Sequence, residues 1–207
     1  MYLLEILAGV VIALGCVASL CAPNYVGSIL FAIGLLMVKR FGLRLLTGKA
    51  GLMIEERVKA PKAAIELGRI FAFNVLGTFL VALAALLMWN VDSPEIVNAI
   101  SRAQVEDLLS VFVRSIFCGM LVYAGVKVEI ALESALETIM YVFAFLVAGF
   151  THSIAYSFYF WTAILVLQGT VQMLFALLIA AVGNVLGCFL IPVAIRGVKL
   201  LSSFGSC

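Results

Sequence analysis

One uncharged stretch constrains this chain more than any other feature of its sequence. From Thr138 to Ile195, 58 consecutive residues include no Asp, Glu, Lys or Arg. A helix that crosses a bilayer needs about 20 apolar residues, so this stretch is long enough for two crossings and a connector. Over the whole chain 65% of the residues are hydrophobic and 12% are charged, whereas soluble domains are about half apolar and about a quarter charged. The sequence therefore excludes a water-soluble globular protein and predicts a polytopic membrane protein.

The other apolar runs predict four more membrane helices. These helices cover residues 6–22, a run that starts near residue 25, residues 70–89 and residues 108–126. The run from residue 25 is apolar only to residue 38, after which Lys39, Arg40 and Arg44 interrupt it. Aromatic residues 156–161 are expected to form an interfacial belt between the last two spans. Because the runs are solidly apolar, a membrane β-barrel with alternating strands is excluded.

Positive charge predicts the orientation of the six spans. Both termini and the loops after the second and fourth spans share one side of the membrane. The basic residues on that side are Lys49, Arg57, Lys59, Lys62, Lys127, Arg196 and Lys199. Arg102 is the only basic residue in the loops of the opposite side. Because cytoplasmic loops are enriched in Lys and Arg, we expect a multi-pass protein of the cell (inner) membrane with both termini in the cytoplasm.

An internal repeat indicates how the spans are organised. The tetrapeptide Asn-Val-Leu-Gly occurs at residues 74–77 in the third span and at residues 184–187 in the sixth, 110 residues later. Two halves of three spans cross the membrane in opposite senses, which is the inverted-repeat plan of many transporters. We predict one channel domain, residues 1–207, with repeats of about 1–91 and 104–200. The residues expected to allow close helix packing are Asn74, Gly77, Asn184 and Gly187.

The second span of each half combines glycine with polar residues deep in an apolar run. These segments are residues 42–48 in the first half and residues 148–153 in the second. Non-helical backbone is tolerated at membrane depth only where protein or a water-filled path covers it. We therefore predict an all-α membrane protein of six transmembrane helices, with helices 2 and 5 broken at a permeation site near the midplane.

His152 is the only histidine of the chain and lies within the uncharged stretch. An ionisable side chain in a bilayer costs several kcal/mol unless it lines a cavity or meets a partner. A role in a pore is favoured, and a helix-packing hydrogen bond is the alternative. We expect no metal site, because no second His, nearby Cys or carboxylate completes a ligand set. We expect no cofactor, no enzyme activity and no nucleic-acid partner, because no catalytic group of residues is visible and the net charge is only +2.

The same positions resemble the motifs of the formate/nitrite transporter family, in the same order over nearly the whole chain. Residues 42–47 resemble Gly-x-Glu-Leu-Phe-Thr, and residues 148–155 resemble Gly-Phe-Glu-His-Ser-Ile-Ala, the most specific match. Residues 113–122 resemble Arg-Gly-Ile-x-Cys-Asn-x-Leu-Val. Residues 73–77 and 183–187 both resemble Gly-Asn-x-x-Gly, the former with phenylalanine in place of the first glycine.

The resemblance implies a homopentamer with one aquaporin-like pore in each protomer, which passes formate, nitrite or hydrosulfide. In the family a histidine faces a threonine in a chamber between two apolar constrictions, and here these residues would be His152 and Thr47. Leu46 takes a constriction position where phenylalanine is common, and Phe150 is the nearest bulky apolar residue of the other break. The expected pore residues are His152, Thr47, Leu46, Phe150, Thr151 and Ser153.

The sequence departs from the motifs at three positions, and two of these changes alter the charge near the pore. Arg44 replaces an acidic residue, Thr151 replaces the Glu before the histidine, and Gly119 replaces an asparagine. The loss of two acids and the gain of a base should favour anions. The basic residues expected to attract anions to the pore mouths are Lys39, Arg40, Arg44 and Arg102. The alternative is that they snorkel or pair with Glu133 and Glu137 of a neighbouring subunit.

These observations predict a membrane channel for small monovalent anions, with formate as the first expected substrate and nitrite or hydrosulfide as alternatives. A bare anion in an apolar constriction costs on the order of 20 kcal/mol by idealised estimates, which a neutral acid avoids. His152 could bind the anion and lend it a proton, because imidazole titrates near neutral pH, while Thr47 orients it. The alternative function is a neutral-solute pore of the aquaporin-like type.

Overall fold

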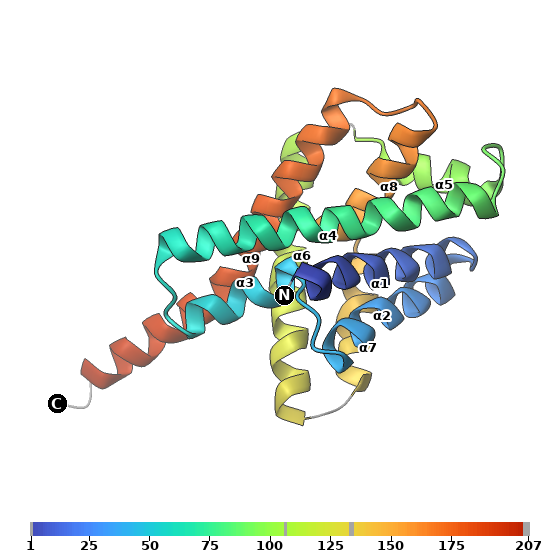
Figure 1. The fold of residues 1–207 in the computed structure, drawn as a ribbon. Coiled ribbons are helices and arrows are strands. Elements are labelled where there is room, and N and C mark those ends of the chain that lie inside the picture. The colour runs from blue at the N-terminus through green and yellow to red at the C-terminus, as the bar shows by residue number, and fades with distance from the viewer. Residues whose placement is uncertain (1, 106, 133–134, 205–207) are drawn as a thin grey trace.

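The computed structural model describes residues 2–105, 107–132 and 135–204. In these residues the chain forms nine helices and no strand (Figure 1). In chain order the helices are α1 (Tyr2–Leu20), α2 (Asn24–Arg40), α3 (Leu46–Glu55), α4 (Ala60–Met88), α5 (Pro94–Ala103), α6 (Leu108–Leu132), α7 (Ala135–Val147), α8 (Ser153–Leu165) and α9 (Val171–Phe204). The prediction of an all-helical protein is confirmed for the described residues.

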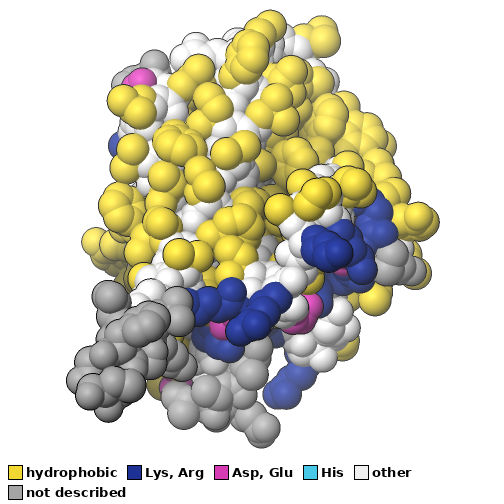
Figure 2. Space-filling view, turned by 90° about the vertical axis from the view of Figure 1, so that its left-hand side faces the viewer, with side chains coloured by type: hydrophobic (Ala, Val, Ile, Leu, Met, Phe, Trp, Pro, Cys, Tyr) yellow, Lys and Arg dark blue, Asp and Glu magenta, His cyan; other side chains and the backbone are white. Residues whose placement is uncertain are grey.

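Four of these helices are long and apolar enough to cross a membrane by themselves: α1, α4, α6 and α9. Helices α7 and α8 are shorter but also apolar. Figure 2 shows one face that is covered by hydrophobic side chains, with Lys and Arg gathered along its lower edge. Exposed hydrophobic residues on the long helices include Leu80, Leu83 and Leu87 of α4 and Leu178, Val182 and Leu186 of α9. Such a surface suits a lipid environment, because lipid solvates apolar side chains that water would not.

The helices pack in two groups with matching contacts. Helix α1 packs against α2 and α4, and α6 packs against α7 and α9. A Cβ atom at Gly77 of α4 would lie 2.1 Å from the carbonyl oxygen of Ile6, and one at Gly187 of α9 would lie 2.0 Å from that of Ile116. Gly187 stands 110 residues after Gly77, and Ile116 stands 110 residues after Ile6. Only glycine permits such a close approach of two helices.

Two interruptions occur at corresponding places, between α2 and α3 and between α7 and α8. Each turns at a glycine in the left-handed region, Gly42 with a φ of +60° and Gly149 with a φ of +70°. The N–H of the residue after each glycine donates to a carbonyl five residues back, at 2.8 Å and 2.9 Å respectively. This hydrogen bond ends a helix in the Schellman motif, which requires the positive φ that glycine adopts without strain.

One expectation from the sequence is wrong, and one segment contains a helix that the sequence did not predict. The aromatic residues 156–161 do not connect two spans at the membrane interface; they lie within α8, where Tyr156, Phe158 and Phe160 are buried. The segment between the third and fourth predicted spans contains α5. Ser93 caps this helix by accepting a hydrogen bond from the Ile96 N–H at 3.3 Å, as serine does before a helix-starting proline.

Candidate functional site

The half-helices α3 and α8 begin beside one another in the interior, although they lie far apart in the sequence. The hydroxyl Oγ1 of Thr47, in the first turn of α3, is 3.2 Å from Nε2 of His152, which immediately precedes α8. Thr47 is 0% exposed and His152 is 4% exposed. The structure thus brings together the two polar residues on which the sequence prediction of a pore depended.

The hydrogen bonds of His152 define how its ring is protonated. Its Nδ1 accepts a hydrogen bond from the N–H of Ala155 at 3.2 Å, so the imidazole caps the N-terminus of α8. A nitrogen that accepts carries no proton, so the proton of the neutral ring is on Nε2, which donates to Thr47. Protonation of Nδ1 would break the cap and place positive charge at a helix N-terminus, where the helix dipole disfavours it. His152 is therefore arranged as a neutral donor.

A buried asparagine of α4 holds the first interruption in place. Asn74 Oδ1 accepts from the N–H of Leu46 at 2.9 Å. Its Nδ2 donates to the backbone oxygen of Arg44 at 2.9 Å and to that of Glu5 at 2.7 Å. The bonds to Leu46 and Arg44 satisfy backbone groups that the interruption leaves without helical partners, which would otherwise be costly in an apolar interior. The bond to the Glu5 oxygen, which lies within α1, joins the interruption to that helix.

Asn184 of α9 does the same for the second interruption. Its Oδ1 accepts from the N–H of Ser153 at 2.8 Å, and its Nδ2 donates to the backbone oxygens of Thr151 at 2.9 Å and Ser115 at 2.8 Å. Asn184 and Ser115 stand 110 positions after Asn74 and Glu5. Ser153 and Thr151 stand 107 positions after Leu46 and Arg44. The sequence predicted close packing for Asn74 and Asn184; the structure gives them these hydrogen bonds in addition.

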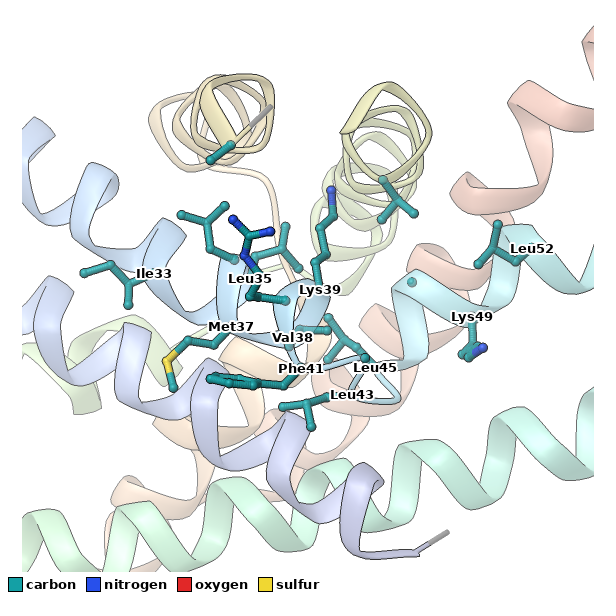
Figure 3. A pocket seen from close by; sticks show the side chains of 16 residues that line it. Ile33, Leu35, Met37, Val38, Lys39, Phe41, Leu43, Leu45, Lys49 and Leu52 are labelled. Carbon is teal, nitrogen blue, oxygen red and sulfur yellow. The ribbon is translucent and has the colours of Figure 1, made fainter. Parts of the chain in front are cut away.

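Two cavities approach the Thr47–His152 pair. The first, of about 950 Å³, is lined by His152, Thr151 and Phe150 and extends to Arg102. The second, of about 1010 Å³, lies beside the first interruption and is lined by residues of α2 and α3 (Figure 3). Leu45 lines the second cavity and stands at the position of the first repeat that corresponds to His152.

Apolar side chains lie between the two cavities. Phe31 lines the first cavity, whereas Leu35 and Leu45 line the second. Phe145 stacks on the His152 ring with 6.0 Å between centroids, and it meets Phe31 edge-on at 6.1 Å. All four apolar residues are at most 3% exposed. Sequence reasoning missed them because hydropathy does not show which side of an apolar helix faces a cavity.

The remaining predicted pore residues occupy different positions. Leu46 is buried and lines neither cavity, and its N–H is held by Asn74. Phe150 lines the first cavity and stacks on Phe117 with 5.5 Å between ring centroids. Ser153 is fully buried, and its hydroxyl has no hydrogen-bond partner among the described residues.

The basic residues expected at the pore mouths are also spread over different environments. Arg102 lines the first cavity and donates to the hydroxyl oxygens of Tyr159 at 3.0 Å and Ser19 at 3.3 Å. Lys39 and the exposed Arg40 line the second cavity. In Figure 3 the Lys39 side chain extends from α2 toward α6 and α7, where Nζ donates to the Gly125 oxygen at 3.0 Å and to Thr138 Oγ1 at 2.9 Å. Of the two carboxylates named as alternative partners in a neighbouring subunit, Glu133 lies outside the described residues, and Glu137 lies in the first turn of α7.

Arg44, the fourth basic residue expected to attract anions, lies in a different environment from the other three. Its guanidinium is paired with the carboxylates of Glu5 and Glu66 within the same chain. Arg44 lines neither cavity. The positive charge that replaces the acidic residue of the motif is therefore balanced inside the protomer.

Comparisons with known proteins agree with this arrangement. The family model described as formate/nitrite transporter matches residues 1–196. An "FNT family ion channel" has a TM-score of 0.80 and 19% sequence identity, covering 92% of this chain and 86% of that chain. A "pentameric formate channel with formate bound" has a TM-score of 0.75 and 19% identity, covering 98% and 96%. No curated protein matches by sequence.

The match to the family rests on most of the chain, and the two solved structures show the same fold independently. Proteins of this family are membrane channels for small anions and not enzymes. This chain belongs to the formate/nitrite transporter family.

Proposed function

We propose that this chain is a channel for small monovalent anions, with formate as its first substrate and nitrite or hydrosulfide as further candidates. The observation that carries the proposal is the contact between Thr47 and His152, 3.2 Å apart and placed where two half-helices begin. The N-terminus of a helix carries about half a positive charge, which favours an anion. Two such ends and two neutral donors suit one small oxyanion.

The two donors suggest how the anion would be held. The Nε2–H of His152 would donate to one oxygen of formate and the hydroxyl of Thr47 to another, replacing the contact between the two side chains. Phe31, Phe145, Leu35 and Leu45 would limit the size of the solute at the apolar constrictions. Because Nδ1 of His152 caps α8, the ring serves better as a hydrogen-bond donor than as the source of a proton. A proton that neutralises the anion would then come from water in a cavity.

For the fold, we propose six spans in two inverted repeats of one domain, residues 1–207. The spans would be α1, α2 with α3, α4, α6, α7 with α8, and α9, within repeats of about 1–91 and 104–200. The matched contacts of Gly77 and Gly187, and of Asn74 and Asn184, support this plan. The half-helices would each cross part of the membrane, as in transporters with broken helices.

We also propose a homopentamer with one pore in each protomer. Support comes from the similar fold of a pentameric formate channel and from exposed apolar faces on the long helices. Close contacts at glycines already pack the helices of each protomer against one another. The apolar helix faces that stay exposed are therefore available to other subunits or to lipid. A native mass of a monomer or dimer in mild detergent would contradict this assembly.

Flux into proteoliposomes tests the proposed function. Uptake of formate, nitrite and hydrosulfide is measured beside uptake of glycerol and urea in the same vesicles. The proposal predicts anion flux well above that of protein-free vesicles and little uptake of the neutral solutes. Rapid glycerol or urea uptake without anion flux would instead support the neutral-solute pore.

Cys21 provides a test of orientation in the proposed cytoplasmic membrane. It is exposed, whereas Cys16, Cys118 and Cys188 are buried, and it follows α1, whose start is proposed to be cytoplasmic. In a Cys207→Ser background, a membrane-impermeant maleimide added outside intact cells is expected to label Cys21. The exposed basic residues Arg57, Lys59 and Lys62 would lie on the cytoplasmic side; the side chain of Lys199 lies outside the described part of the structure.

Two further variants control this labelling experiment. In a background that also lacks Cys21, Asp92→Cys is expected to react from outside and Lys59→Cys only after the membrane is permeabilised. Reaction of Lys59→Cys in intact cells would overturn the orientation and the positive-inside argument behind it.

A further inference from the structure

Four charged side chains meet beside the first interruption, and we call them the charge quartet: Glu5, Arg44, Glu66 and Arg69. Glu5 belongs to α1, Glu66 and Arg69 belong to α4, and Arg44 lies in the connection between α2 and α3. Two carboxylates and two guanidinium groups balance in charge. Glu5 is 0% exposed, and the other three side chains are largely covered.

Both guanidinium groups of the quartet lie within ion-pair distance of both carboxylates, and Arg69 is the more distant of the two from Glu66, at 3.9 Å. Arg44 Nε lies 3.4 Å from Glu5 Oε1, and Arg44 Nη2 donates to Glu66 Oε1. Arg69 Nη2 donates to the same Glu5 oxygen at 2.9 Å. Arginine can make such contacts through separate nitrogens of a rigid planar group, which a lysine ammonium cannot reproduce.

The quartet is connected to the backbone that precedes the pore residues. The backbone oxygens of Glu5 and Arg44 accept from the same Asn74 amide, and the N–H of Arg44 donates to the Leu4 oxygen at 3.3 Å. Arg44 is thus tied to α1 and α4 through its side chain and its backbone. Leu45, which lines the second cavity, and Thr47, which faces His152, follow directly.

The second interruption has no such charges. The positions that correspond to the quartet are Ser115, Thr151, Ala176 and Ile179. There the Ser115 hydroxyl donates to the Val111 oxygen within its own helix, and Asn184 makes the same bonds as Asn74. The asparagine bridge is therefore common to both halves, whereas the quartet is specific to the first.

We propose that the charge quartet positions the first interruption, and that Arg44 acts as a positioning residue for Leu45 and Thr47 rather than as an attractor of anions. This inference rests on the proposed channel function. Removal of Arg44 would leave the buried carboxylate of Glu5 with fewer partners, and removal of the Glu5 charge would leave both arginines with Glu66 as their one carboxylate in the quartet. In either case the connection would shift, and a misplacement of about 1 Å at a binding site is enough for a large loss of activity.

The test compares formate flux per assembled channel in proteoliposomes for the wild type, Arg44→Lys, Arg44→Gln and Glu5→Gln. The proposal predicts that all three variants lose about tenfold in flux, at low and at saturating formate alike. An anion-attracting Arg44 predicts the opposite pattern: Arg44→Lys keeps its flux, and Glu5→Gln, which makes the region more positive, gains flux at low formate. Either of those results would overturn the proposal.

A matched control separates positioning from loss of charge. Lys62 is exposed on α4, one turn before Glu66, and Lys62→Gln removes a positive charge without touching the quartet. We expect normal flux from Lys62→Gln. If the quartet variants assemble poorly but conduct normally per assembled channel, the quartet only stabilises the protein and the proposal fails. Glu66→Gln, at a partly exposed site, is the milder variant should Arg44→Gln not fold.

A readout without transport keeps this inference separate from the proposed function. In a background without Cys21 and Cys207, the reaction rate of a Leu45→Cys thiol with a maleimide is measured with and without Arg44→Gln. The proposal predicts a clear change in rate, because Leu45 lines a cavity beside the interruption. Absent flux of formate, nitrite and hydrosulfide in the wild type would reject the proposed function, whereas an unchanged Leu45→Cys rate would reject positioning by the quartet.

Discussion

Formate flux through His152→Phe is expected to fall by about 100-fold or more, while the protein still folds and assembles. The substitution removes the Nε2–H donor that faces Thr47, and preorganised donors of this kind are worth about 100- to 1000-fold where charge must be stabilised. It also removes the acceptor for the Ala155 N–H, which costs helix α8 about 1 kcal/mol. Flux is measured per assembled channel in proteoliposomes, beside the thermal stability of the same preparation.

His152→Asn is the control for this variant. Asparagine is a good N-cap and can also donate a hydrogen bond, so partial flux is expected. Because the account treats His152 as a neutral donor, the dependence of flux on pH should follow that of the wild type. A flattened pH profile would show instead that His152 lends a proton. Wild-type flux through well-folded His152→Phe would remove His152 from the mechanism altogether.

The largest effect on folding is expected for Asn184→Leu. This change leaves the N–H of Ser153 and the backbone oxygens of Thr151 and Ser115 without their present partner. The Ser115 oxygen keeps its helical donor within α6, whereas the Ser153 N–H and the Thr151 oxygen have no helical partner. Each buried polar group without a partner costs about 1–3 kcal/mol, so the loss at these two groups is a large part of the stability of many proteins. We expect little assembled protein from detergent extracts, and a lower unfolding temperature for what assembles.

Asn90→Leu is the matched control, because Asn90 is exposed just after α4 and the chemical change is the same. It should behave like the wild type in gel filtration and in thermal unfolding. Asn74→Leu should fail as Asn184→Leu does, because Asn74 makes the corresponding three bonds. A stable, assembled Asn184→Leu protein would contradict the role assigned to both asparagines.

Much of the site follows from local sequence patterns. Gly42 and Gly149 are needed where a helix ends with a positive φ, so glycine beside polar residues in an apolar run was a usable signal. The pairing of Thr47 with His152 was predictable from the motif resemblance, because the two segments occupy corresponding places in the two halves. The physical reason for both signals is that non-helical backbone at membrane depth must be surrounded by protein or by a water-filled path.

The remainder depends on contacts that a single sequence does not encode locally. Nothing in the sequence around Arg44 indicates that Glu5 is its partner, so its charge was assigned to anion attraction. The aromatic residues 156–161 have no charged neighbours, and the same composition suits a membrane interface or a buried half-helix. Helix α5 is short and has polar residues, so hydropathy windows miss it, although Ser93 and the proline after it mark its start.

The central claim is that His152 meets the permeating anion as a neutral Nε2–H donor, and its unique position allows a direct measurement. Because it is the only histidine, a protein purified without a histidine tag and labelled with ¹⁵N-histidine shows the ring nitrogens of this residue alone. The account predicts a neutral Nε2–H tautomer at neutral pH, with an Nε2 resonance that shifts as formate is added and does not shift with glycerol. An imidazolium ring at neutral pH, or an Nε2 resonance that ignores formate at concentrations that saturate flux, would contradict it.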